Sequence, residues 1–306
     1  MGVLEAILLT VITAATPLVL AAIGELVVER SGVLNLGVEG MMIVGAVTGF
    51  AAANATGSPL VGVAAAALGG MVLSALFAFL ILFLVANQYA TGLALTLLGL
   101  GLSGMIGEAY VGTPGVRLGR IDIPVLSDIP FLGPVLFSQD ILVYLSFALV
   151  AGVSWFLFRS RAGLVLRAVG DNHASAHALG FSVRRVRFAA VLFGGACAGL
   201  GGGYLSLVYT PQWIEGMTAG RGWIALALVV FASWLPGRLA VGAYLFGAVM
   251  ILQFHAQAAG IGIPSQFLTM LPYLATVVVL VAISRDRTRI RLNTPATLGQ
   301  PFVPDR

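Results

Sequence analysis

Residues 60–85 read LVGVAAAALGGMVLSALFAFLILFLV, a run without one charged side chain. The hydrocarbon core of a bilayer is about 30 Å thick, and an α-helix of about 20 apolar residues crosses it. This run is therefore long enough to cross a membrane once. Working outward, the whole stretch 40–107 lacks Asp, Glu, Lys and Arg, which leaves room for almost three such helices. The sequence predicts an all-α membrane protein, a helical bundle that crosses the bilayer many times.

The composition of the whole chain excludes several classes of protein. Of 306 residues, 59% are hydrophobic and 9% are charged. A soluble domain carries roughly 25% charged residues, so an ordinary water-soluble enzyme is excluded. All 16 basic residues are arginine, and without lysine the chain has neither a P-loop nor a Schiff-base amine. The arginines flank apolar segments and form no aromatic-interleaved face, so we expect no nucleic-acid partner.

Apolar stretches separated by turn residues predict about nine spans, with eight to ten as the range. The breaks fall on residues typical of turns, for example at 54–59, 87–88 and 236–237. We expect a transmembrane domain over 1–284 and an arginine-rich tail over 285–306. The predicted spans are 4–28, 33–53, 60–85, 91–110, 141–158, 188–209, 222–235, 239–259 and 267–284.

The arginines gather in two places, which predicts the orientation of the chain. The connection 159–187 holds six arginines and one acid, and the tail 285–306 holds five arginines. Basic segments stay on the cytoplasmic side of a membrane, so we expect both of them there. Four predicted spans separate them, and an even number returns the chain to the same side. The external loop 111–140 and, for an odd number of spans, the amino terminus then lie outside.

The stretch 24–42, GELVVERSGVLNLGVEGMM, places charged and polar residues between two predicted spans. Its glycines permit a broken helix whose free backbone groups line a cavity. Ionisable groups at membrane depth are costly and usually face a bundle interior or a water path. We expect Glu29 and Arg30 to lie among the lipid headgroups. For Asn35 and Glu39 we expect a structural or pathway role inside the bundle.

Asn87, Gln88 and Thr91 form a second polar interruption between apolar segments. A turn is the favoured interpretation, because asparagine and its neighbours punctuate helices in this way. The alternative is that these side chains line a translocation pathway. The sequence alone leaves both readings open.

Trp213, Glu215, Arg221 and Trp223 cluster at a predicted outer interface. Tryptophan is common there as a membrane anchor, and a surface Glu–Arg pair contributes little stability. The alternative is that Trp213, Glu215 and Arg221 hold a lobe of an external solute-binding protein.

The arginine-rich connection predicts a short helix. Asp171 or Asn172 can cap its start, and Gly180 can end it in the left-handed conformation. Two turns alone in water are marginal, so this helix needs a partner to pack on it. A docking element and an ordinary basic loop are equally supported. His173 and His177 face one side, but no glutamate or cysteine accompanies them, so we expect no metal.

No nucleophile, base and orienting group come together anywhere, so we expect a transporter without a catalytic site. Three blocks carry a resemblance to a known family: the stretch 24–42, ANQYATGLAL at 86–95 and GRGWIALA at 220–227. With residues 167–180 they resemble, in order, the permease subunits of ABC importers of the sugar and nucleoside type. These are relatives of the ribose and branched-chain amino acid permeases. The resemblance covers about residues 20–284 and implies a type II-like importer permease fold.

The resemblance also implies partners. Two permease chains would form the pore, as a heterodimer with a longer permease or, alternatively, as a homodimer. Separate ATPase subunits would hold ATP and Mg²⁺, which agrees with the missing lysine, and an extracytoplasmic binding protein would deliver the solute. We expect a nucleoside or related purine, with a sugar or an amino acid as the alternative, and a bacterial inner membrane as the location. A stand-alone secondary transporter is the more distant alternative, because the spans offer few carboxylates for ion coupling.

Residues 167–180 resemble the coupling helix of this family, and the sequence departs from the family at His173, where proline is frequent, and at His177. The helix placement is unaffected by these departures. The residues that the resemblance places at the ATPase are Arg167, Gly170, Asp171, Asn172, His173, His177 and Gly180.

Overall fold

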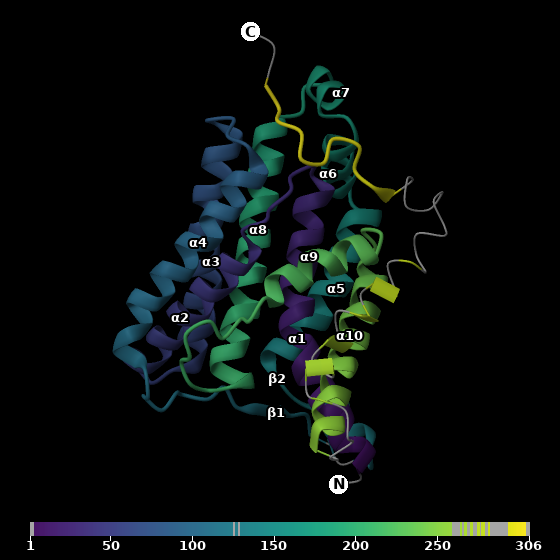
Figure 1. Ribbon diagram of the computed structural model, residues 1–306. Helices are drawn as coiled ribbons and strands as arrows, with labels where there is room; N and C mark the ends of the chain where they lie inside the picture. Colours follow the sequence, from purple (N-terminus) through teal and green to yellow (C-terminus); the bar gives the residue numbers. More distant parts are fainter. Residues whose placement is uncertain are drawn as a thin grey trace.

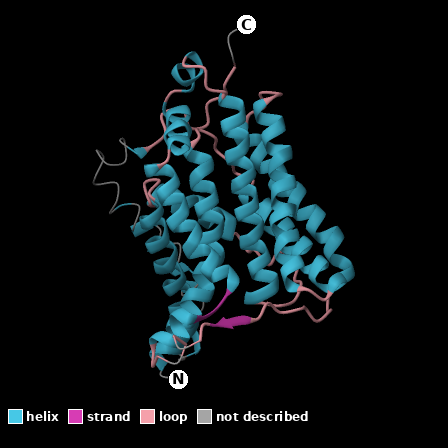
Figure 2. Ribbon diagram, turned by 180° about the vertical axis from the view of Figure 1, so that it is seen from behind, coloured by secondary structure: helices cyan, strands magenta, loops and turns pink. Residues whose placement is uncertain are grey.

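A computed structural model describes residues 3–124, 126–127, 129–258 and 293–303, and isolated residues between 264 and 281. The chain is a bundle of helices with a small β-ribbon near one end (Figures 1 and 2). The helices are α1 (Val3–Arg30), α2 (Val38–Thr56), α3 (Pro59–Leu82), α4 (Gln88–Gly107), α5 (Ile141–Arg159), α6 (Arg161–Asp171), α7 (His173–Ala178), α8 (Val183–Tyr204), α9 (Arg221–Phe231) and α10 (Pro236–Ala258). The shorter elements are η1 (Glu108–Tyr110), β1 (Arg120–Asp122), η2 (Gly133–Phe137), β2 (Ser138–Asp140) and η3 (Leu205–Tyr209), and β1 pairs antiparallel with β2.

Seven helices of the described chain are long and apolar enough to cross a membrane: α1, α2, α3, α4, α5, α8 and α10. This confirms the predicted polytopic helical membrane protein. Local turn chemistry explains the boundaries. Gly57 ends α2 in the left-handed conformation and Pro59 starts α3. Asn87 caps α4, and Asp140 caps α5 by accepting from the N–H groups of Leu142 and Val143.

The predicted span at 222–235 contains a helix too short to cross a membrane by itself. The helix found there, α9, has 11 residues, which at 1.5 Å per residue is about 16 Å, half of a bilayer core. The irregular segment 210–220, which precedes α9, has already entered the bundle before the helix begins. The predicted span at 267–284 lies largely outside the described residues.

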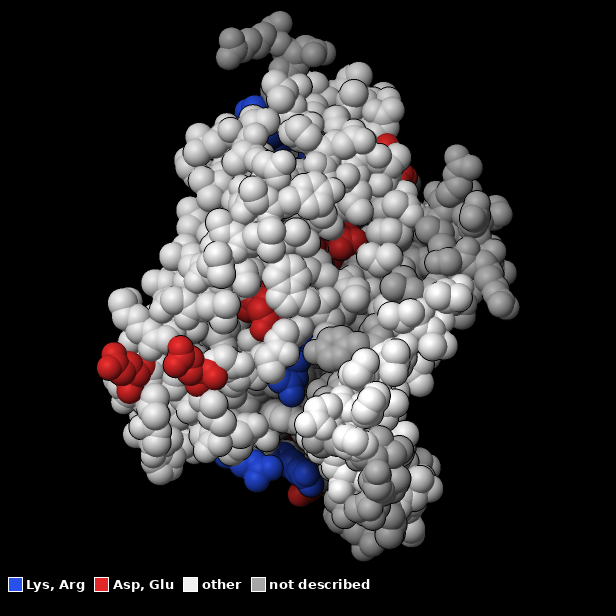
Figure 3. Space-filling view, in the orientation of Figure 1, with Lys and Arg blue, Asp and Glu red and all other residues white. Residues whose placement is uncertain are grey.

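Helices α1, α2, α3 and α8 pack together in the interior of the bundle. Glycine permits the closest approaches: a Cβ added to Gly45 of α2 would lie 2.4 Å from Cα of Gly199, and one added to Gly199 of α8 would lie 2.1 Å from the carbonyl oxygen of Ala66. Such contacts between backbones stabilise helices in lipid. On the outside, Val72 of α3 and Leu97 of α4 are each 70% exposed. Figure 3 shows charged side chains as a few small patches on an otherwise uncharged face.

The bundle has two distinct ends. Helices α6 and α7 and the segment 293–303 lie at one end, which we call the α7 end (top of Figure 1). The β1–β2 ribbon and the start of α1 lie at the other, which we call the β end. The arginine-rich connection and the last described residues therefore lie together, and the amino-terminal helix begins at the opposite end.

Candidate translocation and coupling site

Two irregular segments enter the bundle from opposite ends: residues 31–37, the first break, and residues 210–220, the second break. Helix α4 runs beside both breaks, so the α4 residue that each part of a break contacts gives its depth in the bundle. The first break begins at the α7 end, where the Leu34 N–H donates to Gln88 Oε1 at 2.9 Å. Further along, the Leu36 carbonyl accepts from Thr96. A Cβ added to Gly99 would lie 2.7 Å from Cα of Gly40, so α2 starts deep inside the bundle.

The second break climbs along the same helix from the β end. A Cβ on Gly107, the last residue of α4, would meet the Trp213 ring, and one on Gly104 would lie 3.4 Å from Glu215. Gly222, in the first turn of α9, then lies against the backbone of Glu39. The chain has risen past about eight residues of α4, or about 12 Å.

Helices α2 and α9 therefore both begin near the level of Gly99, roughly 16 Å from one end of α4 and 12 Å from the other. Their amino termini meet near the middle of the bundle. The first N–H groups of a helix have no partner within the helix and carry partial positive charge. Two such termini at one place form an electropositive site inside a membrane protein.

The Glu39 carboxylate occupies this site. Its Oε1 accepts from the Thr218 hydroxyl at 2.6 Å and from the Gly220 N–H at 2.9 Å. Its Oε2 accepts from the Gly222 N–H at 2.6 Å. The side chain is 5% exposed. Glu39 lies in the first turn of α2 and accepts from an N–H group in the first turn of α9, so one carboxylate joins the starts of the two helices.

Asn35 is buried and shapes the first break. Its Oδ1 accepts from the Gly37 N–H at 2.9 Å, and its own N–H donates to Glu25 Oε1 at 3.3 Å. The other oxygen of Glu25 is buried and has no hydrogen-bond partner in the described part of the chain. Asn35 therefore shapes the backbone of the first break, and a pathway role for Asn35 and Glu39 stays a prediction.

Glu29 and Arg30 do not lie at a lipid interface, and that prediction is wrong. Both side chains are buried in the last turn of α1. Glu29 Oε2 accepts from the Trp234 indole N–H at 2.6 Å. The Arg30 guanidinium donates to the carbonyl oxygens of Trp234 and Asn293. The turn after α9 and the segment 293–303 cover this end of α1, which no local pattern in the sequence reveals.

At the start of α4, Asn87 Oδ1 accepts from the Ala90 N–H at 3.0 Å, which confirms the turn interpretation. Gln88 is buried and joins the Leu34 N–H to the carbonyl oxygen of Gln300. Thr91 is half-buried on the next turn of α4. A pathway role for these three residues stays a prediction.

The predicted short helix of the arginine-rich connection is confirmed as α7. Asn172 caps it by accepting from the Ser175 N–H at 2.9 Å, and Gly180 follows it with φ +87°. His173 and His177 lie on one face, as predicted, and each ring centroid is 5.3 Å from that of Phe302. Partial burial and the neighbouring Arg187 charge lower the pKa of His173 below its ordinary value.

The residues predicted to contact an ATPase differ in accessibility. Asp171, Asn172, His177 and Gly180 are exposed, and Arg167 and His173 are half-buried. Gly170 is buried: a Cβ there would lie 2.1 Å from the carbonyl oxygen of Arg30. This glycine lets α6 approach the end of α1, and its part in coupling to an ATPase stays a prediction.

Residues 293–303, which we call the C-terminal strap, connect α7 to the first break. The Thr297 N–H donates to the Gly170 carbonyl at 3.0 Å, and the Gly299 N–H to the Gly32 carbonyl at 3.2 Å. Arg187 of α8 is fully buried beneath the strap. Its guanidinium donates to the carbonyl oxygens of Ser31 (3.1 Å) and Gln300 (3.0 Å). Apart from Arg187, which lies near the start of α8, no residue pattern in the sequence predicts the strap.

The residues predicted at the outer interface separate in the structure. Trp213 is 3% exposed and packs against Gly107, so a buried indole offers no surface to another protein and this prediction is wrong. Glu215 is exposed. Arg221 folds back, half-buried, and donates to the carbonyl oxygens of Met217 and Thr218.

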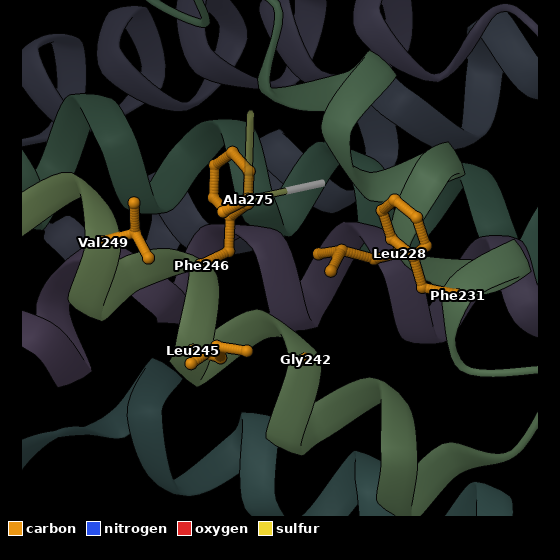
Figure 4. Close-up of a pocket in the computed structure, with 7 residues that line it drawn as sticks. All are labelled: Leu228, Phe231, Gly242, Leu245, Phe246, Val249 and Ala275. Atoms are coloured by element: carbon orange, nitrogen blue, oxygen red, sulfur yellow. The ribbon is translucent and has the colours of Figure 1, made fainter. Parts of the chain in front are cut away.

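The cavity in Figure 4, between α9 and α10, encloses about 40 Å³. A cavity of this size holds little more than a water molecule, and water needs polar partners. Its lining is apolar, so it is not a solute site. The lining residues are Leu228, Phe231, Gly242, Leu245, Phe246, Val249 and Ala275.

Seven spans and two interrupted helices that meet at mid-depth define a multi-pass membrane protein built like a transporter. The family model described as "Branched-chain amino acid transport system / permease component" matches residues 7–283. The chain belongs to this family and is the permease component of an ABC transporter of the sugar and nucleoside group. Permeases of this kind work with ATPase and solute-binding proteins.

Three relatives align with nearly the whole chain. The chain is 39% identical over 314 residues to the putative glucose ABC transporter permease protein TsgC13 of Haloferax volcanii, with 95% of each chain covered. It is 31% identical over 309 residues to the guanosine ABC transporter permease protein NupQ of Bacillus subtilis, covering 94% of this chain and 93% of that one. It is 33% identical over 290 residues to the nucleoside ABC transporter permease protein NupC of Lactococcus lactis, covering 90% and 92%.

Proposed function

We propose that this chain forms half of the pore of an ABC importer and that α7 transmits the movement of a separate ATPase to that pore. The second half is another permease chain, in a heterodimer or, alternatively, a homodimer. ATP and Mg²⁺ belong to the ATPase subunits, and this chain binds no cofactor. The α7 end faces the cytoplasm, as the positive-inside rule favours.

The observation that carries this proposal is the connection from α7 to the meeting point of the breaks. His173 and His177 of α7 contact Phe302 of the strap. Arg187 then binds both the strap and Ser31 of the first break. That break leads into α2, whose first turn holds Glu39. A displacement of α7 therefore has a continuous route of contacts to the helix termini at mid-depth.

The outer surface of the α7 region suits docking. Leu179 is 77% exposed and Phe181 is 41% exposed, on either side of Gly180. Exposed apolar side chains that lie together mark sites of interaction with another protein. We propose that they enter a groove of the ATPase, with exposed Asp171, Asn172 and His177 around them. Closure of the ATPases then pushes α7 and changes which end of the pore is open.

The β end receives the solute-binding protein in this proposal. Glu215 is exposed on the part of the second break that lies beside the last turn of α4. Because the second break ends at Glu39, a protein that binds the break has direct access to the same meeting point that α7 reaches from the opposite end.

The solute we propose is a nucleoside or related purine, because two relatives are named for guanosine and nucleoside transport. A sugar is the second candidate, because the relative at 39% identity is named a putative glucose permease. The electropositive helix termini are already neutralised by Glu39, which suits uncharged solutes of either class better than anions.

The test is transport by the complete assembly in vesicles. Permease, partner permease, ATPase and binding protein are reconstituted, and ATP hydrolysis and uptake are measured with guanosine, adenosine, ribose and glucose. Stimulation by nucleosides above sugars is expected. Stimulation by glucose alone would replace the nucleoside assignment with the sugar one. Uptake driven by an ion gradient without the ATPase would overturn the ABC importer proposal itself.

A further inference from the structure

A cleft opens at the α7 end where the end of α3 meets the start of α8. It encloses about 520 Å³. Two spans finish here, so the cleft lies at the depth of the headgroups of one leaflet. The lining combines three aromatic rings with two guanidinium groups and includes no acidic residue. The lining residues are Phe79, Phe83, Ser182, Arg184, Arg185 and Phe188.

The aromatic wall of the cleft is continuous. The Phe79 and Phe83 rings stack with centroids 5.8 Å apart, and Phe188 meets Phe83 edge-on at 6.4 Å. Val72, Leu76, Phe79 and Phe83 follow one face of α3 at helical spacing, and all four are exposed. The cleft therefore continues as an apolar strip towards the bilayer core, along the path of an acyl chain.

Among the described residues, no acidic side chain lines the cleft to neutralise its charge. The Arg184 guanidinium carbon lies 6.0 Å from the Phe83 ring centroid. Arg184 Nε is buried and has no hydrogen-bond partner among the described residues. Arg185 is exposed beside it. Ser182 is the N-cap residue of the 22-residue helix α8, but its side chain accepts no hydrogen bond from the first N–H groups of that helix. These N–H groups carry partial positive charge beside the cleft.

We propose that this cleft binds an anionic phospholipid. Arg184 and Arg185 hold the phosphate, and Phe79, Phe83 and Phe188 contact the first part of an acyl chain. A free phosphate ion has the same charge but leaves the aromatic wall exposed to water. An acidic protein surface can pair with Arg185, but it would not bury the exposed apolar strip along α3. Basic pockets between spans at the cytoplasmic face recognise anionic headgroups by this chemistry.

The test measures lipid retention by the full chain. Nanodiscs of phosphatidylcholine mixed with phosphatidylglycerol are exchanged into detergent, and the lipids that remain bound are quantified by mass spectrometry. For the double variant Arg184→Gln/Arg185→Gln, the preference for phosphatidylglycerol falls roughly tenfold. The matched control Arg159→Gln/Arg161→Gln removes two exposed arginines of the same end that lie outside the cleft, and it keeps the preference. An unchanged preference in the first variant, or an equal loss in both, overturns the proposal.

Two further arms separate the possible occupants. Arg185→Gln alone changes an exposed side chain, so the fold is retained and a smaller loss in the same direction is expected. Inorganic phosphate is added to the wild-type chain: if it displaces phosphatidylglycerol completely, the cleft is an ion site and the lipid assignment is overturned. If Arg185→Gln instead weakens ATPase retention and leaves lipid retention unchanged, the cleft is a protein contact and the proposal also fails.

Discussion

The two breaks are both irregular segments that precede a helix, and they differ in burial and in bonding. The first break, 31–37, is buried along nearly all its length and is tied to α4, α8 and the strap by hydrogen bonds. The second break, 210–220, has five exposed residues and two buried ones, and it meets the first at Glu39. A buried, well-bonded segment moves as a unit, whereas an exposed loop adapts to what binds it. We infer that movement enters through the first break and becomes an opening or closing at the second.

The largest expected effect comes from separating the breaks at their meeting point. Glu39→Ala removes the acceptor of one hydroxyl and two N–H groups in a buried site, which costs about 3 kcal/mol of stability. Thermal unfolding in detergent measures this as a lower Tm, and solute uptake is lost. Glu215→Ala, an exposed glutamate on the second break, is the control and leaves Tm unchanged. Equal Tm values for both variants would contradict the role of Glu39.

The next effect comes from cutting the first break away from the strap. Arg187→Gln removes the donors to Ser31 and Gln300, together with the contacts of Nη2 to His173 and Thr297. We expect the stimulation of ATP hydrolysis by solute to fall about tenfold, the size of a coupling free energy of 1 to 3 kcal/mol.

Exposed Arg159 provides the matched control for this variant, and Arg159→Gln keeps the stimulation. The assembly must still form, which co-purification of the ATPase verifies. A full stimulation in the Arg187→Gln variant would show that the strap is not on the route between α7 and the pore.

A smaller effect is expected at the end of α7. Gly180 has φ +87°, and a β-branched residue there costs about 1 to 2 kcal/mol of local strain. In the Gly180→Val variant α7 is displaced from its docking position, so ATP hydrolysis loses its coupling to solute while the binding protein still binds solute. Gly180→Asn tolerates the left-handed conformation better and is expected to keep most of the coupling.

The smallest effect is a dependence on pH at the contact between α7 and the strap. Because the pKa of His173 is lowered in the folded state, the detached segment takes up a proton first as the pH falls. The contact is therefore fully formed above about pH 6.5, the ordinary histidine value, and weakens below it. Protection factors from amide exchange over α7 measure this loss, and His173→Gln is expected to remove the pH dependence. A dependence that persists in that variant would assign it to another group.

Local chemistry made much of the fold predictable. Asn87, Asp140, Gly57 and Gly180 act on their own turn of the chain, and the helix boundaries they predict agree with the structure within a few residues. The uncharged runs predicted most of the spans because their length and hydrophobicity are also properties of the local sequence.

The errors share a different cause, which is contact between residues far apart in sequence. Arg30 is buried because Trp234 and Asn293 cover it, more than 200 residues later. Trp213 is buried because Gly107 leaves space for an indole. Residue type and spacing carry no information about such partners, so the strap and the meeting of α2 with α9 emerged only from the structure.

The central claim is that a push on α7 moves the second break through the strap and Glu39. Spin labels on Glu215→Cys and Leu60→Cys, both at exposed positions, report that movement, and native Cys197 is buried and leaves the labelling specific. The distance between the labels is measured in the complete assembly with and without ATP. We predict that ATP changes the distance in the otherwise unaltered chain and that Arg187→Gln abolishes the change. If ATP changes the distance equally in the unaltered chain and in the Arg187→Gln variant, the account is contradicted.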